Sequence, residues 1–135
     1  MALKDIRGPL RSFLLSDPDI ASAVGNSRIF LKTLPQGERR ASLVYMRPSE
    51  IATFTHTGAD TLVKARMQID AWAPNDDAAA ALADNVKELM NGYRGAWGTV
   101  EVQGVFMQTI SSDDYDSQST MFRVGRDYLI CYLEI

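Results

Sequence analysis

Few residues of this 135-residue chain have types and spacings that could carry out catalysis. The single histidine, His56, stands four residues before Asp60 in a stretch of small polar residues. An acyl-transfer triad needs a base beside a nucleophile in a rigid site that excludes water, which a polar loop tip does not provide. The segment Gly25-Asn26-Ser27 begins like a nucleophile elbow, but Ile29 stands where the second glycine belongs. We therefore assign no catalytic residue and predict that the protein is not an enzyme.

Carboxylates gather at Asp113, Asp114 and Asp116, where they could suggest a calcium loop. A loop that began at Asp114 would need a glycine at its sixth position and a glutamate at its twelfth, where Gly125 stands instead. One cysteine and one histidine cannot complete a structural zinc site. Three glycines between residues 92 and 98 follow a predicted helix, whereas a dinucleotide-binding turn opens one. We expect neither a metal nor a cofactor.

Polar segments offer candidate contacts with other proteins. Two neighbouring arginines, Arg39 and Arg40, follow a turn that contains Pro35 and Gly37. Guanidinium groups pair well with carboxylates, so these arginines either face solvent or pair with the acidic segment of a neighbouring subunit. The candidate interface residues are Arg39, Arg40, Phe54, His56, Asp60, Asp113, Asp114, Tyr115 and Asp116.

The first half of the chain supplies two predicted helices and three predicted strands. Apolar spacing predicts a helix over residues 3–14, kinked or started at Pro9, and Asp17-Pro18 predicts the start of a second that ends at Gly25. Strands are predicted over 28–33 and 42–47, with Pro48 ending the second or placing it on an edge. Residues 52–61 are predicted to form an exposed hairpin tip, and 62–73 a strand with one buried face.

The second half adds a helix from Asp76 to about Gly92 and a loop over 92–98. A strand over 99–110, an acidic loop over 111–119 and a strand over 122–135 follow. The last strand is apolar on both faces near its end, which places it in the middle of the sheet or under a partner. Because strands cluster instead of alternating with helices, we predict an α+β fold. It has a mostly antiparallel sheet, helices on one face and long hairpin loops.

Composition limits the protein to one domain, residues 1–135, of 15.0 kDa. A net charge of -3 argues against a dedicated nucleic-acid-binding protein, which usually carries a basic excess. The single cysteine cannot form an intrachain disulfide, which fits a reducing compartment. We recognise no signal peptide, lipidation motif or membrane span, so no membrane partner is expected.

Several short segments, in this order, resemble one known family. They are Leu15-Ser16-Asp17-Pro18, Val24-Gly25, Arg28-Ile29-Phe30, Leu34-Pro35-Gln36-Gly37, Val44-Tyr45, the strand from Arg66 to Ala73, an alanine-rich helix, an acidic loop and Tyr128-Leu129-Ile130. Together they are similar, over nearly the whole chain, to the tail completion proteins of long-tailed bacteriophages and gene transfer agents. These are also called tail terminator or tail-to-head joining proteins. The turn over 34–37 and the segment Gln68-Ile69-Asp70-Ala71-Trp72 are the most telling.

The resemblance implies a structural role without catalytic residues. Such subunits form a ring, expected to be a hexamer, that caps the tail tube and joins it to the head-tail connector. Double-stranded DNA passes through the centre without sequence-specific binding. The resemblance also implies a place at the head-tail junction of the virion, after assembly in the cytoplasm of the bacterial host.

Other functions stay open. One alternative is a head-side connector ring, a stopper or adaptor. Another is a small ligand-binding α+β domain, with a pocket lined by aromatic residues at 45, 72, 93 and 97. An interaction domain of the toxin or adaptor kind is a weaker third.

Two hypotheses about the ring follow. Sheet edges or the 52–61 hairpin supply one side of the contact between subunits, because ring closure needs two different patches. Part of the acidic excess, such as Asp113, Asp114 and Asp116, lies near the channel or an axial contact. A basic lumen would hold DNA, whereas an acidic or neutral lumen lets it slide.

Overall fold

The strands of the described residues form one six-stranded sheet, with strand order β1-β2-β3-β6-β5-β4. The computed structural model describes residues 6–54, 61–98 and 100–134. Strand β1 is parallel to β2, and every other neighbouring pair is antiparallel, which confirms the mostly antiparallel α+β prediction. The strands are β1 Ile29–Leu31, β2 Ser42–Phe54, β3 Thr61–Ala73, β4 Gly95–Trp97, β5 Val100–Asp116 and β6 Met121–Glu134.

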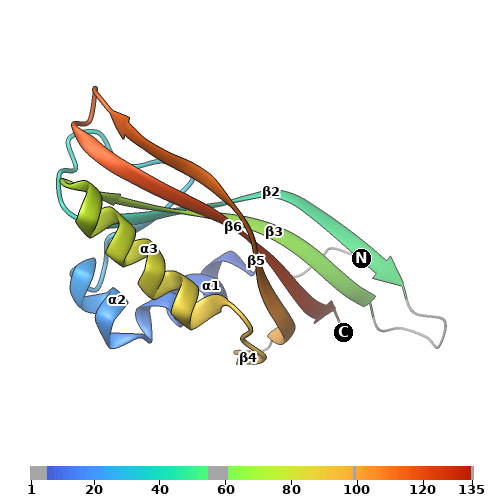
Figure 1. The fold of residues 1–135 in the computed structure, drawn as a ribbon. Coiled ribbons are helices and arrows are strands. Elements are labelled where there is room, and N and C mark those ends of the chain that lie inside the picture. Colours follow the sequence, from blue (N-terminus) through green and yellow to red (C-terminus); the bar gives the residue numbers. More distant parts are fainter. Residues whose placement is uncertain (1–5, 55–60, 99, 135) are drawn as a thin grey trace.

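In the described part of the chain, three helices cover one face of the sheet: α1 Arg7–Leu15, α2 Pro18–Ala23 and α3 Asp76–Met90. The long strands extend past the helices at both ends (Figure 1). The β2–β3 hairpin projects at one end of the sheet, and the β5–β6 hairpin projects at the other. The molecule therefore carries two arms that point in opposite directions.

The core lies between α3 and the sheet. Every second residue of β3, from Val63 to Ala71, is buried, as the alternation along this strand predicts. Leu82, Val86 and Met90 of α3 pack in the same cluster. Of the two predictions for the last strand, the central place is confirmed, because β6 is paired with β3 on one side and with β5 on the other.

The helix starts follow their capping residues. The side chain of Asn75 accepts a hydrogen bond from the backbone N–H of Ala78 at 2.8 Å, and Asp17 caps α2 in the same way. Pro9 lies in the first turn of α1, where its missing N–H costs little. Helix α3 ends at Met90, two residues before the glycine predicted to stop it.

One of the two predictions for Pro48, that it ends strand β2, is wrong. The strand continues to Phe54, and its register with β3 shifts between Met46 and Ser49. Strand β1 pairs with the segment from Leu43 to Tyr45, and no strand among the described residues lies on the outer side of Pro48. An edge position tolerates the missing N–H of a proline, and the alternative prediction was correct.

The acidic segment at 111–119 is not a loop throughout. Strand β5 continues to Asp116, and Asp113 to Asp116 pair with the segment from Met121 to Val124. The cross-strand contacts with β6 outweigh the low strand propensity of aspartate. A short strand, β4, also occupies part of the predicted 92–98 loop and places Trp97 in the core.

Candidate assembly surfaces

The predicted interface residues fall at the two ends of the sheet. Arg39 and Asp116 line one hollow at the end where the β5–β6 arm projects. Phe54 is the last residue of β2, at the opposite end, where its backbone pairs with Thr61. His56 and Asp60 lie outside the described residues. The structure therefore brings the arginine segment and the acidic segment to one end, and separates both from Phe54.

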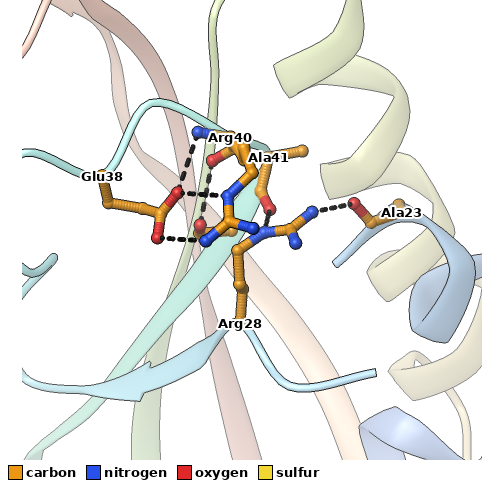
Figure 2. Close-up of polar contacts among 6 residues, drawn as sticks. Ala23, Arg28, Glu38, Arg40 and Ala41 are labelled. Atoms are coloured by element: carbon orange, nitrogen blue, oxygen red, sulfur yellow. Dashed lines mark hydrogen bonds and ion pairs between the residues drawn. The ribbon is translucent and has the colours of Figure 1, made fainter. Parts of the chain in front are cut away.

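Arg40 pairs with Glu38 inside its own loop (Figure 2). Its Nε and Nη2 donate to the two carboxylate oxygens of Glu38, at 3.0 and 3.2 Å. Its backbone N–H donates to Oε1 as well, at 3.0 Å. These donors lower the pKa of Glu38 to about 2. Arg40 thus has a carboxylate partner in its own subunit, without a neighbour's acidic segment.

Arg28 ties the same loop to helix α2. Its Nε donates to the carbonyl of Ala41 at 2.8 Å, and its Nη2 donates to the carbonyl of Ala23 at 3.2 Å (Figure 2). The guanidinium lies so close to Gly25 that a Cβ there would stand 2.5 Å from Nη1. Gly25 also has a φ of +60°, which favours glycine. The loop is therefore anchored to the body through one arginine and one glycine.

A hollow of about 570 Å³ lies at this end of the sheet, on the face opposite the helices. The loop over 32–39 and the turn after β5 form its walls, and Trp72 and Arg123 contribute to its lining. Arg39 and Asp116 are on opposite walls of this one hollow, within a single chain.

The end of β5 is acidic and partly paired. Arg123 donates to both carboxylate oxygens of Asp114, at 3.0 and 2.8 Å, and its guanidinium lies 5.4 Å from the centre of the Trp72 ring. This pairing lowers the pKa of Asp114. Ser119 lowers the pKa of Asp116 too, first through its side chain and then through its backbone N–H, which donates to Asp116 at 3.2 Å. Asp113 is exposed.

Sequence reasoning missed two buried carboxylates on the face opposite the helices. Asp70 is 3% exposed and accepts from the Gln68 amide at 3.1 and 3.3 Å. Asp127 is 1% exposed, and its Oδ2 accepts from Arg66 at 3.1 and 2.6 Å. Burial raises the pKa of Asp70, against the opposing effects of Gln68 and Arg123. The alternation along β3 places Asp70 on the solvent-exposed face of the sheet. Nothing in the sequence indicated that Asp70 is buried beneath a hollow.

The aromatic residues considered for a ligand pocket do not converge. Tyr45 and Trp97 are core residues, 4% and 3% exposed. The ring of Tyr93 stacks on Trp97 with centroids 6.0 Å apart. Trp72 lines the hollow on the other face of the sheet from Tyr45. The predicted preference of Tyr45 and Trp97 for the core is confirmed.

Within residues 6–54, 61–98 and 100–134, no group of three or more His, Cys, Asp or Glu side chains could hold a metal ion. None of the helices in the described part of the chain is long and apolar enough to cross a membrane.

Comparisons with known proteins bear on the whole fold. A chain from a solved structure entitled "Virion of native gene transfer agent (GTA) particle" superposes with a TM-score of 0.64 at 16% sequence identity. The match covers 96% of this chain and 98% of the other, so the two share a fold. No curated protein matches the sequence. The family model described as "Tail completion protein gp17" matches residues 8–132. The chain therefore belongs to the tail completion protein gp17 family, whose members are structural proteins of the phage tail.

Proposed function

We propose that this protein is the subunit of a ring that closes the end of a phage tail tube and joins it to the head-tail connector. The family match over residues 8–132 is the observation that carries the proposal. The candidate residues support it, because those described are spread over two ends of a sheet and do not form a catalytic constellation. In this role the subunit belongs to the virion, after assembly in the host cytoplasm.

The shape of the subunit suits a junction between rings. The β2–β3 and β5–β6 arms project from opposite ends of the sheet (Figure 1). An arm that projects beyond the ring can contact the tube protein or the connector. The ring itself, for which we propose six subunits, closes through two different patches on each copy.

The sheet edges are poorly suited to pairing with a neighbour. Strand β5 has register shifts between Met107 and Thr109 and between Ile110 and Ser112, and β2 carries Pro48 beside its own shift. Bulges, prolines and charged residues are devices that prevent edge-to-edge pairing. This argues against edge-to-edge pairing of strands as the contact between subunits.

Charge supports passage of DNA through the ring. The net charge is -3, and Asp113, Asp114 and Asp116 stand together at the end of one arm. Carboxylates near the channel repel phosphates, so the duplex is not held there. Substitution of all three by lysine is expected to reduce the yield of joined, infectious particles at least tenfold. Normal particles from that variant would contradict a place near the channel or an axial contact.

The protein could form its ring at the end of the tail tube or on the head side of the junction. Deletion of its gene should give different particles in the two cases. A tube terminator stops growth of the tube, so particles assembled without it should show tails of uncontrolled length that are not joined to heads. A head-side stopper closes the filled head, so its loss should leave tails of normal length beside heads that have lost DNA. Electron micrographs of a strain with the gene deleted give the answer, and joined, intact particles in that strain would overturn both.

A further inference from the structure

Two exposed aromatic side chains occupy opposite faces of the same strand. Phe106 and Tyr115 are each 51% exposed, which is unusual for large apolar residues. Phe106 is opposite Leu129, which is in turn level with Arg66 on the face away from the helices. Tyr115 is opposite Phe122, level with Ala73, on the helix side of the sheet. The two aromatics therefore face in opposite directions.

The surface around Phe106 is apolar with a basic border. We call Phe106, Leu129 and Cys131 the platform. Gly104 pairs with Cys131, and a Cβ on this glycine would stand 3.0 Å from the Phe106 ring, so the ring lies over the backbone there. The exposed side chains of Lys64 and Arg66 border the platform on β3. Glu101 lies beyond it, opposite Leu133.

The surface around Tyr115 has the opposite charge. We call Asp113 and Tyr115 the acidic tip. Both face the helix side of the β5–β6 arm, which extends past α3 (Figure 1). The ring of Tyr115 packs on Phe122 with centroids 4.9 Å apart and still exposes half its surface. Residues 113–120 contain three aspartates and no cation.

We propose that the acidic tip of one copy lies on the platform of the next, so that neighbouring subunits of the ring overlap head to tail. The proposal rests on the ring proposed above and names the surfaces that close it. Two patches of opposite charge, each with an exposed aromatic and each on a different face of the sheet, make a head-to-tail contact. Tyr115 covers Phe106 and Leu129, and Asp113 faces Lys64 and the exposed side of Arg66, which also pairs with Asp127 of its own copy.

The single cysteine of the chain makes the contact measurable, because Cys131 belongs to the platform. In a Tyr115→Cys variant, the new thiol of one copy should lie beside Cys131 of the next. Mild oxidation of assembled tails, followed by non-reducing electrophoresis, should give a ladder of linked subunits. Burial raises the pKa of the Cys131 thiol, so the oxidation is best done at mildly alkaline pH.

Two control variants make the test specific. Glu88→Cys places a thiol on an exposed position of α3, away from both surfaces, and should give at least tenfold less linked dimer. Tyr115→Cys combined with Cys131→Ser should give no linked dimer. A Tyr115→Cys variant that assembles into tails without forming the ladder would overturn the inference and leave the proposed ring intact. Absence of the wild-type protein from purified tails would overturn the proposed function.

Discussion

The ion pair between Arg66 and Asp127 joins a half-exposed cation to a buried carboxylate. The Arg66 side chain is 50% exposed, whereas that of Asp127 is 1% exposed. The second oxygen of Asp127 has no hydrogen-bond partner among the described residues, so Arg66 supplies its compensation. We predict that Arg66→Gln lowers the free energy of unfolding by roughly 2 kcal/mol. This is less than the loss from a fully buried pair, because solvent reaches the guanidinium.

Urea unfolding measures this loss, with Lys64→Gln as the matched control on the same strand face. The control should change stability by less than about 0.5 kcal/mol, as exposed substitutions do. Adding Asp127→Asn to Arg66→Gln should restore part of the loss, because it removes the uncompensated charge. Equal stabilities of Arg66→Gln and the wild type would show that water already screens Asp127.

The contribution of Asp70 to folding stability changes with pH in the opposite direction from that of a carboxylate in an ion pair. Its pKa is raised above the ordinary 3.8 because burial disfavours the charged form. The folded protein therefore holds this proton more tightly than the unfolded chain. As the pH rises from below 3.8 through the raised pKa, the contribution of Asp70 to stability falls.

We predict that Asp70→Asn is more stable than the wild type at neutral pH, and that the difference shrinks to zero in acid below that window. Urea midpoints across pH measure it, and Asp113→Asn is the exposed control. The asparagine carbonyl can still accept from Gln68, so the change removes the charge and keeps an acceptor. A less stable Asp70→Asn at neutral pH would show that Gln68 and Arg123 outweigh the cost of burial.

At the scale of elements, helix α3 depends on its first turn. Asn75 accepts from the N–H of Ala78, and Asp76 and Asp77 add negative charge at the N-terminus. We predict that Asn75→Ala lowers the free energy of unfolding by about 1 kcal/mol. Asn75→Asp keeps the acceptor and should change it little. If both variants unfold at the wild-type midpoint, packing of α3 on the sheet is enough to set its start.

Elements with a strong local pattern could be predicted from the sequence, and elements decided by pairing could not. The alternation along β3 and the start of α3 at Asp76 are local patterns, so both were predicted, although the cap at Asn75 was not. The last residues of strand β5 are rich in aspartate and serine, which by themselves indicate a loop. Only the ladder with β6, including Arg123 against Asp114 and Phe122 against Tyr115, makes them a strand.

The candidate site shows the same division. The acidic segment was found because charged residues stand next to each other in the chain. The platform was not found from the sequence, because Phe106, Leu129 and Cys131 meet only through the register of β5 with β6. The Arg66–Asp127 pair joins residues 61 positions apart and left no signal in spacing.

At the scale of the whole molecule, a head-to-tail contact makes a prediction that a two-fold contact does not. A tip-deficient variant, Tyr115→Asp, keeps its platform, and a platform-deficient variant, Phe106→Asp, keeps its tip. Each variant alone lacks half of every contact and should stay monomeric under conditions in which the wild type forms the ring. The expected cause is loss of apolar burial together with charge repulsion or mismatch at the contact.

Mixing the two variants should form one intact contact per pair and then stop. The platform of the Tyr115→Asp copy receives the tip of the Phe106→Asp copy, and the remaining tip and platform of that pair are both defective. Analytical ultracentrifugation should therefore show heterodimers in the mixture, monomers in each variant alone and rings in the wild type. A mixture that stays monomeric, or that closes into full rings, would contradict the overlap of tip on platform.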